Sequence, residues 1–459
     1  MMTSQLPKLF REFRHIDQLI AVTPELKKMP VIEVSELLLL IDEHQQLRIL
    51  SCFSPKQQGA IVSDFPIQSQ MALFHASKTR RFALIFENMP SENRADLFPH
   101  FEPQEQTAIL PFLSKTVRED VIQLSAYPPE TAGGIMSTDF ATVQQNMTCA
   151  QAMEKVRSDA PSKRTVYYIY VVNDNQTMQG FITLKDLIMA EPSVKVSEVV
   201  HREFIFVYAE EDRESVAQKI EKYDLVALPV LNADHQLAGI VTHDEALEII
   251  RAEQTEDMEK FMGIMPDKDE LDYMATSSWK HFKKRAVWII TLAALGILSG
   301  LIIHGYESTL ENFIILALYM PMVADTGGNS GSQAATVVVR AMALGQISAK
   351  DWLKILWKEA KISLLLAICL GVLAFAKVLF LSWETPIPAL YSLSRIAFAI
   401  ALALSIQVIT ATIIGAGLPI LVKRLGGDPA VAASPAITTI VDITGLLIYF
   451  GVTTMFFAL

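Results

Sequence analysis

Five apolar stretches in residues 285–459 constrain this chain more than any other feature of its sequence. They follow the basic tripeptide at 283–285 and cover Ala286–Ile303, Asn312–Val339, Ile362–Trp383, Ile396–Val422 and Pro429–Leu459. Each is long enough for a helix to cross the roughly 30 Å of hydrocarbon in a bilayer. No soluble fold needs five such segments in succession, so the sequence predicts a membrane domain of five helices.

The charges that flank these stretches predict an orientation. Basic residues gather at 281–285, in the loop 340–361 and at 423–424, whereas the alternate loops carry carboxylates. Basic loops stay on the cytosolic side of a membrane. We therefore expect a multi-pass protein of the inner (cytoplasmic) membrane, with the preceding 280 residues in the cytosol and the C-terminus outside.

One carboxylate lies deep in the fifth stretch. Asp442 is followed by seventeen uncharged residues, and Ser434 and Thr438 precede it at helical spacing, so the three oxygens form one stripe. An ionisable residue at this depth is a functional-site hypothesis by default. Hydroxyl and carboxylate oxygens suit Mg²⁺ or Ca²⁺ rather than soft metals. The stripe predicts part of an ion pathway; the alternative is a polar cluster that hydrogen-bonds neighbouring helices.

The second stretch carries another polar face. Asn329 and Gln333 recur at helical spacing, and Asp325 precedes them by one turn. A polar face at membrane depth is tolerated against protein or a water-filled cavity. We predict a pore or pore-supporting role for Asn329 and Gln333, and either a second ion site or a vestibule charge for Asp325. The interspersed glycines permit close helix packing or a local break.

A repeat with an offset of 59 residues lies upstream, where residues 171–189 resemble residues 230–248. Each copy shows the pattern of strand, polar turn, strand and helix, with another helix before it, which indicates two copies of one unit packed together. The pattern resembles a tandem pair of CBS modules. That resemblance implies that Thr183 and Asp186, in Thr-Leu-Lys-Asp at the start of the last helix, contact the ribose of an adenine nucleotide such as ATP. The alternative is a helix cap.

Residues 36–128 contain short amphipathic segments punctuated by prolines, among them Pro66, Pro90 and Pro103. Proline is tolerated in the first helical turn. The pattern predicts a succession of short helices in an α-superhelix. Three widely spaced cysteines and the absence of a long apolar core in residues 1–11 indicate free thiols and no secretory signal.

Charge is divided unevenly. Residues 285–459 hold 10 basic and 8 acidic residues of the chain's 39 and 50, so they have a net charge of +2 and residues 1–284 have −13. An acidic half makes nucleic acid a poor partner. Seven carboxylates lie in residues 244–259, directly before the membrane domain. Packed carboxylates repel unless cations bridge them, so we predict a divalent-cation sensor, with a solvated helical face as the alternative.

The motifs together resemble the MgtE family of magnesium channels over essentially the whole chain. They are Thr131-Ala-Gly-Gly-Ile-Met136 before the repeat, Thr255-Glu256-Asp257, Thr326-Gly-Gly-Asn329 followed by Gly331-x-Gln333, and Asp442-Ile-Thr-Gly-Leu-Leu-Ile-Tyr449. The resemblance implies a homodimer in the lipid bilayer with a Mg²⁺ pore on its two-fold axis. It also implies that cytosolic Mg²⁺ closes the pore by binding acidic residues of the CBS and connecting-helix region.

Site residues follow by match to the family. The pore aspartate is Asp442, Thr438 falls where a pore-lining backbone carbonyl is expected, and the family's asparagine eight residues before the aspartate is Ser434 here. The candidates for regulatory Mg²⁺ are Asp212, Glu214, Asp224, Glu245, Glu248, Glu253, Glu256 and Asp257. The helical N-terminal domain offers no ligand that the sequence identifies.

We thus expect a multidomain membrane protein: a helical N-terminal domain, two α/β CBS domains, a connecting helix and a five-helix transmembrane domain. Their expected bounds are 1–130, 131–198, 199–250, 251–280 and 281–459. The expected function is Mg²⁺-selective uptake gated by cytosolic Mg²⁺, and no enzymatic motif is apparent. The alternatives are a transporter that couples Mg²⁺ to Na⁺ or H⁺, a membrane-anchored nucleotide sensor, and a channel tuned to Co²⁺ or Mn²⁺.

Overall fold

The N-terminal part of the chain folds into short helices, as predicted. The structure, a computed structural model, describes residues 10, 22–266, 273–274, 276–387, 391–432 and 434–457, apart from the side chains of residues 162 and 312. The chain divides into two units, Met1–Glu253 and Gln254–Leu459. The α-helices described between residues 22 and 130 are α3 (Thr23–Leu26), α4 (Val31–Leu38), α5 (Glu43–Leu50), α6 (Pro55–Ser63), α7 (Ile67–Ala76), α8 (Thr79–Glu87), α9 (Ser91–Leu97), α10 (Pro103–Ile109) and α11 (Lys115–Leu124).

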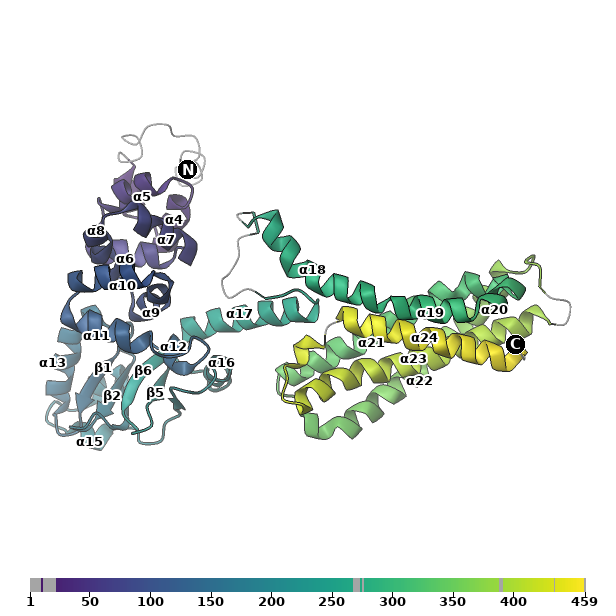
Figure 1. Cartoon of the computed structure of the whole chain (residues 1–459). Coiled ribbons are helices and arrows are strands. Elements are labelled where there is room, and N and C mark those ends of the chain that lie inside the picture. Colours follow the sequence, from purple (N-terminus) through teal and green to yellow (C-terminus); the bar gives the residue numbers. More distant parts are fainter. Residues whose placement is uncertain are drawn as a thin grey trace. The chain divides into compact units, whose positions relative to one another are not determined.

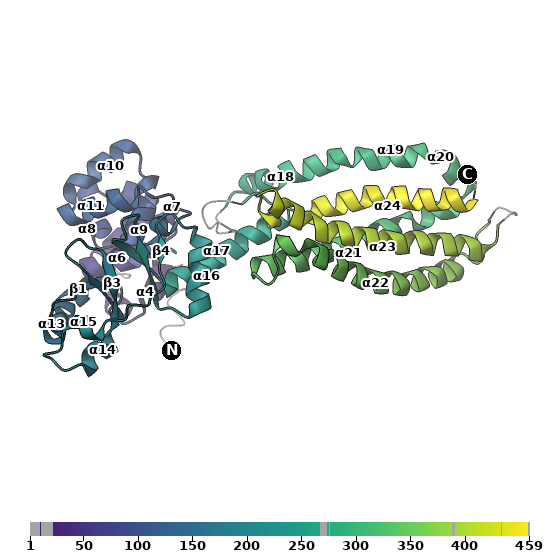
Figure 2. The ribbon, with the colours of Figure 1, turned by 90° about the horizontal axis from the view of Figure 1, so that it is seen from below.

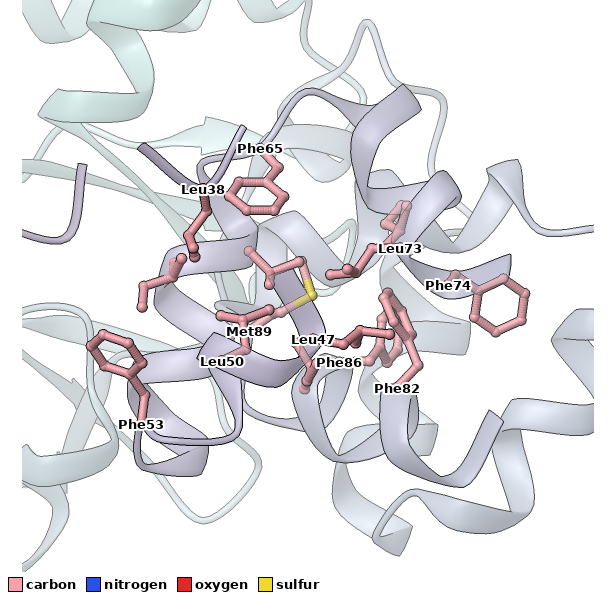
Figure 3. Packing of buried hydrophobic residues seen from close by; sticks show 14 of the residues in the cluster. Leu38, Leu47, Leu50, Phe53, Phe65, Leu73, Phe74, Phe82, Phe86 and Met89 are labelled. Carbon is pink, nitrogen blue, oxygen red and sulfur yellow. The ribbon is translucent and has the colours of Figure 1, made fainter. Parts of the chain in front are cut away.

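Prolines begin several of these helices. Pro66 and Pro90 are the N-caps of α7 and α9, and Pro103 is the first residue of α10. The first N–H groups of a helix have no intrahelical acceptor, so proline loses nothing there. The apolar faces meet in one core, where Phe82 and Phe86 are both 0% exposed (Figure 3).

Two small sheets follow, one for each copy of the repeat. The first contains β1 (Ala141–Gln144), β2 (Tyr168–Val172) and β3 (Met178–Thr183), and the second contains β4 (Val207–Tyr208), β5 (Ala227–Leu231) and β6 (Leu237–Thr242). In each sheet the middle strand pairs in parallel with the first and antiparallel with the third. The accompanying helices are α12 (Ala132–Ile135), α13 (Cys149–Asp159), α14 (Leu184–Met189), α15 (Val196–Val199), α16 (Arg213–Tyr223) and α17 (His243–Phe261).

The turns of the two copies confirm the repeat in detail. Gln176 and His235, 59 residues apart, both adopt positive φ, at 62° and 56°. The side-chain oxygens of Asn173 and Asn232 accept backbone hydrogen bonds from the turn that follows each of them. The turns also exchange backbone hydrogen bonds of 3.2 Å in each direction, so the copies meet about an approximate two-fold axis.

The helix expected as a connector over 251–280 lies earlier in the chain. The last helix of the second module, α17, continues without a break from His243 to Phe261. Gly263, at φ 70°, follows its end, and positive φ is the conformation that favours glycine after a helix. Part of the expected connector, residues 267–272 and 275, lies outside the described residues.

The membrane unit contains long helices and the shorter α19 (Ile297–Gly305) and α20 (Glu307–Asn312). The long helices are α18 (Ser278–Leu295), α21 (Ile314–Ala343), α22 (Trp352–Leu381), α23 (Leu393–Arg424) and α24 (Ser434–Phe457). Figures 1 and 2 show α19 and α21 to α24 running alongside one another. In the described part of the chain, four helices are long and apolar enough to cross a membrane: α18 with α19, α22, α23 and α24. With α21, which is 30 residues long and carries the polar face, they correspond to the five predicted segments.

The predicted loop at 340–361 is shorter than expected. Helix α22 begins at Trp352, so the lysines at 354, 358 and 361 lie on its first turns. Tryptophan and lysine are anchors of the membrane interface, and they extend the helix beyond its apolar core. The ammonium group of Lys361 lies 5.4 Å from the ring centre of Trp357, and the Arg424 guanidinium lies 5.0 Å from that of Trp352.

Candidate functional site

Helices α21 and α24 border a cavity of about 310 Å³. Its lining includes Asp325 and Asn329 from α21 and Thr438 and Asp442 from α24. Pro321, Ala324 and Gly328 complete it. The structure therefore brings together four of the six residues that the sequence proposed for a pore, from segments more than 100 residues apart.

Ser434 adjoins this cavity without lining it. Its hydroxyl donates to Oγ of Ser332 at 3.0 Å, and the hydroxyls of Ser332 and Thr438 are 3.4 Å apart. Thr438 in turn donates to the backbone carbonyl of Ser434 at 3.1 Å. These contacts link α21 to α24 beside the cavity. Ser332 belongs to this hydrogen-bonded group, and the sequence analysis did not identify it.

Gln333 lies outside the cavity lining and is exposed on α21. Asp325, Asn329 and Thr336 are also exposed on this helix, so the four residues recur at intervals of three or four. The opposite face of α21 is buried against neighbouring helices. A stripe of amide, hydroxyl and carboxylate groups in a membrane helix is unfavourable against lipid, so the chain exposes a polar face that needs water or protein.

The glycines of α21 serve close helix packing, one of the two alternatives that the sequence left open. The helix is continuous from Ile314 to Ala343, with no break at the glycines. A Cβ atom on Gly328 would lie 3.0 Å from Cγ2 of Thr438, and one on Gly331 would lie 3.0 Å from the backbone oxygen of Ala411. Small residues let membrane helices approach this closely.

A second cluster of polar groups lies in the N-terminal unit, where α17 meets α9. Burial and the neighbouring carboxylates of Asp96 and Glu92 raise the pKa of Glu245 well above its ordinary value. The surrounding protein and then Glu92 raise the pKa of Asp96 to about 7, although part of the Asp96 surface stays exposed. Carboxylates from the helical domain and from the second CBS module therefore oppose one another.

Arg164 partly neutralises the negative charge of this cluster. Nη1 of Arg164 lies 3.3 Å from Glu92, and its Nη2 donates to Asp244. Glu92 and Asp96 stand one turn apart on α9, directly after Pro90. This i, i+4 pair of carboxylates was the available signal in the sequence, but nothing local indicated that it faces a helix about 150 residues further along.

Three of the proposed sensor residues have local structural roles on α16. The Asp212 carboxylate caps the helix by accepting from the backbone N–H of Ser215 at 3.1 Å. Glu214 accepts from Gln218 at 2.9 Å. Asp224 ends the helix in the left-handed region, at φ 52° and ψ 49°.

The remaining candidates lie along α17. Glu248 faces the cluster with Glu245 and Asp96, and Glu253 accepts from Nε of Arg213 at 2.8 Å. Glu256 lies 2.6 Å from the ammonium group of Lys260, and Asp257 follows on the same helix. No group of three or more His, Cys, Asp or Glu side chains in the described ranges is arranged to hold a metal ion.

The proposed nucleotide residues form a helix cap. Oγ1 of Thr183 accepts from the Asp186 backbone at 3.1 Å, while Asp186 accepts from the Thr183 backbone at 2.8 Å. Asp186 also lies 2.9 Å from Nε2 of His201. Burial raises the pKa of Asp186, but the bonds from Thr183 and His201 outweigh it and lower that pKa overall. Reciprocal capping is the role that the alternative interpretation expected.

Comparison with known families finds matches across both units. The family described as MgtE, divalent cation transporter, matches residues 320–452. The MgtE intracellular N domain matches residues 29–130. CBS domains match residues 132–193 and 196–252.

Individual proteins are also similar. The chain is 35% identical over 340 residues to the magnesium transporter MgtE of Thermus thermophilus, covering 74% of this chain and 73% of that one. It is 29% identical over 415 residues to the magnesium transporter MgtE of Bacillus subtilis, covering 90% and 89%. A solved structure of the cytosolic domain of the Mg²⁺ channel MgtE in complex with ATP is 26% identical, with a TM-score of 0.43, and covers 50% of this chain and 98% of that one.

Proposed function

Since the chain belongs to the MgtE family of magnesium transporters, and is a multi-pass membrane protein with an intracellular N domain and not an enzyme, we propose that it is a Mg²⁺-selective uptake channel of the cytoplasmic membrane. The observation that carries this proposal is the cavity in which Asp325, Asn329 and Asp442 meet. The proposal includes the positive-inside orientation, with the C-terminus outside, and the domain bounds expected from the sequence, except that the connecting helix is the end of α17, up to Phe261.

The cavity suits a hydrated ion. Mg²⁺ prefers six oxygen ligands and gives up water reluctantly. Six waters at about 30 Å³ each occupy roughly 180 Å³, and the cavity of about 310 Å³ has room for them. The carboxylates of Asp442 and Asp325 would attract the ion through its water shell, with Asn329 and Thr438 as further polar contacts. Binding by an outer shell is strong enough to admit an ion and weak enough to release it.

The same cavity supports the homodimer as the functional state. Its α21 side is exposed on the single chain, together with Asp325 and Asn329. Lipid is an unfavourable neighbour for these groups. A second copy related by a two-fold axis would cover them and place two Asp442 carboxylates around one ion pathway.

Gating by cytosolic Mg²⁺ is the third element of the proposal. The Glu245, Asp96 and Glu92 carboxylates oppose one another across α17 and α9 without forming a three-ligand metal site, and a divalent cation that screens their charge would reduce their repulsion. Mg²⁺ therefore favours the arrangement in which the helical domain and the second CBS module are together. The pore is closed in that arrangement. Further candidate ligands for regulatory Mg²⁺ are the α17 carboxylates Glu248, Glu253, Glu256 and Asp257 and the α16 carboxylates Asp212, Glu214 and Asp224.

We extend the proposal to an adenine nucleotide, such as ATP, at the first CBS module. Thr183 and Asp186 stand at the start of α14, where a ribose would take the place of His201 beside the Asp186 carboxylate. Calorimetric titration of the full chain with ATP tests this. His201→Ala is expected to retain or strengthen binding, and Asp186→Asn to weaken it.

The decisive experiment is ion flux in proteoliposomes. The full chain, Asp442→Asn and the control Asp351→Asn are compared under a membrane potential, with Mg²⁺ reported by a trapped dye. Asp351 is an exposed carboxylate that lies 3.2 Å from the ammonium group of Lys354. We expect Asp442→Asn to lose about 100-fold or more of the flux, because one charge at a desolvated site is worth several kcal/mol, and Asp351→Asn to conduct normally. Wild-type flux through Asp442→Asn would overturn the pore assignment.

The same vesicles separate a channel from a coupled transporter. A channel gives current that follows the Mg²⁺ gradient and the membrane potential alone. A Na⁺ or H⁺ gradient that drives Mg²⁺ uphill would instead show coupling, with Asp325 or Asp442 as the titrating or ion-binding carrier group.

A further inference from the structure

A buried glutamine lies behind the wall of the cavity. Gln407 belongs to α23 and its side chain is 0% exposed. Its Nε2 donates to the backbone carbonyl of Val441 on α24 at 2.8 Å. Its Oε1 is buried without a hydrogen-bond partner among the described residues. Leaving a buried polar atom unpaired is unfavourable. The hydrogen bond that Nε2 donates must therefore offset a cost that an apolar side chain at this position would not have.

Gln407 also occupies the space between two glycines. A Cβ atom on Gly327 of α21 would lie 2.5 Å from Nε2 of Gln407, and one on Gly445 of α24 would lie 2.6 Å from the same atom. In both cases the three nearest atoms all belong to Gln407. The carboxamide is therefore the reason that neither position admits a side chain, and it contacts both helices that border the cavity.

The contacts fall at the level of the proposed ion site. Val441 directly precedes Asp442, and Gly327 directly precedes Gly328, which lines the cavity. The carbonyl of Val441 also accepts from the hydroxyl of Thr444 at 3.0 Å, so two side chains hold the helical turn that carries Asp442. The position of this turn relative to α21 fixes the separation of the two carboxylates in the cavity.

We propose that Gln407 is a positioning residue for ion selection, which sets the spacing of α21 and α24 and thereby favours Mg²⁺ over Ca²⁺. The inference rests on the proposed channel function. Selection between these ions depends on cavity size and on the rigidity of the oxygen groups, because Mg²⁺ demands a compact octahedral shell while Ca²⁺ accepts six to eight ligands. A hydrogen bond supplies rigidity that packing alone does not, since its direction and length are both fixed.

The experiment compares Mg²⁺ and Ca²⁺ flux in proteoliposomes that contain the full chain. Gln407→Met keeps the length of the side chain and removes the N–H donor. We expect its Mg²⁺ flux to fall about tenfold and its ratio of Mg²⁺ to Ca²⁺ flux to fall severalfold, because a displacement below 1 Å at a site of this kind is enough. Ser405→Ala is the matched control: Ser405 lies on the same helix and donates to the Ala367 carbonyl of α22 at 3.0 Å, so its loss leaves the ratio unchanged.

A size exchange keeps the inference testable if Gln407→Met folds poorly. Gly445→Ala alone is expected to lower the yield of folded protein, and Gly445→Ala with Gln407→Ala to restore it, because the added methyl group then occupies vacated space. The restored protein is expected to keep the reduced ion ratio. Gly451→Ala, on the same helix with nothing within 4 Å of the added atom, serves as the control for α24.

Two results overturn the inference in different ways. An unchanged ion ratio in Gln407→Met and in the size exchange, while Asp442→Asn is inactive, removes the role of Gln407 and leaves the channel intact. Normal flux through Asp442→Asn removes the proposed function, and the inference about Gln407 with it.

Discussion

The ammonium group of Lys260 lies 2.8 Å from the carboxylate of Asp428, 168 residues further along the chain. The same ammonium lies 2.6 Å from Glu256, one turn earlier on α17. Burial lowers the pKa of Lys260, but the two carboxylates outweigh it and raise that pKa overall. One lysine thus joins the end of α17 to the segment before α24 and neutralises a carboxylate on each side.

Lys260→Met is expected to weaken this connection and to raise the resting Mg²⁺ flux of proteoliposomes that contain no internal Mg²⁺. The carboxylates of Glu256 and Asp428 would then repel each other. Partly exposed ion pairs contribute about 1 kcal/mol or less, so the change in flux should be within about fivefold. Internal Mg²⁺ should restore closure, because a divalent cation replaces the missing charge. Lys354→Met removes a largely exposed pair with Asp351 and should change neither quantity.

Ser434→Ala is expected to retain most of the Mg²⁺ flux. Ser434 contacts Ser332 beside the cavity but does not line it. Loss of one hydrogen bond of this kind changes stability by about 1 kcal/mol. Flux per folded channel should therefore remain within a few fold of wild type, in contrast to Asp442→Asn. A loss as complete as that of Asp442→Asn would place Ser434 in direct contact with the ion.

The N-terminal unit should become less stable as the pH rises through about 7 in the absence of divalent cations. The pKa of Asp96 is raised from 3.8 to about 7 and that of Glu245 is also raised. Between pH 3.8 and about 7 the folded state binds more protons at Asp96 than the unfolded chain does. The stabilisation is therefore complete below pH 3.8 and is lost as the pH rises through about 7. Calorimetry of the full chain with EDTA, from about pH 5 to pH 8, measures this slope.

One variant and one added ion identify the groups that cause this pH dependence of stability. Asp96→Asn should flatten the slope, and millimolar Mg²⁺ should raise the transition temperature most at the high end of the range, where the carboxylates are charged. An equal slope in wild type and in Asp96→Asn would assign the pH dependence to other groups.

The buried pair of Arg94 and Asp120 should matter far more for stability than the exposed pair of Lys115 and Glu119. Arg94 and Asp120 are 2.9 Å apart with side chains 8% and 15% exposed, and Arg94 also donates to the Met89 carbonyl at 2.6 Å. Removing one partner of a buried pair costs about 3–5 kcal/mol. Arg94→Met should therefore lower the unfolding temperature by several degrees in calorimetry.

The exposed pair is the comparison. Lys115 and Glu119 are 3.8 Å apart with side chains 86% and 67% exposed. Lys115→Met should change the unfolding temperature little, because exposed pairs contribute about 0–1 kcal/mol. Equal effects of the two substitutions would show that burial does not decide what these ion pairs contribute to stability.

Much of the architecture was predictable because it depends on local periodicity. The membrane segments follow from hydropathy, and the repeat follows from residues 59 positions apart, as the matched turns at Gln176 and His235 show. The stripe of Thr438 and Asp442 follows from helical spacing, and the structure brings the predicted residues Asp325 and Asn329 to the same cavity. The sequence predicts a loop up to residue 361 whereas α22 begins at Trp352, because interfacial lysines resemble a loop when only charge is considered.

Partners from distant segments were not predictable in the same way. The opposition of Asp96 and Glu245, the bridge of Lys260 and the position of Gln407 depend on how separate helices pack. A single sequence shows Gln407 as one amide in an apolar helix, and nothing in its neighbourhood indicates the two glycines that face it.

The arrangement around Gln407 limits the order in which substitutions can accumulate during evolution. A larger residue at 327 or 445 displaces the glutamine side chain unless position 407 has become smaller, because the glutamine fills the space at both glycines. Loss of the amide first is then the route with the least steric cost. Homologues that carry a side chain at either glycine should therefore have a small residue at 407, and the three positions should change together as a lineage diverges.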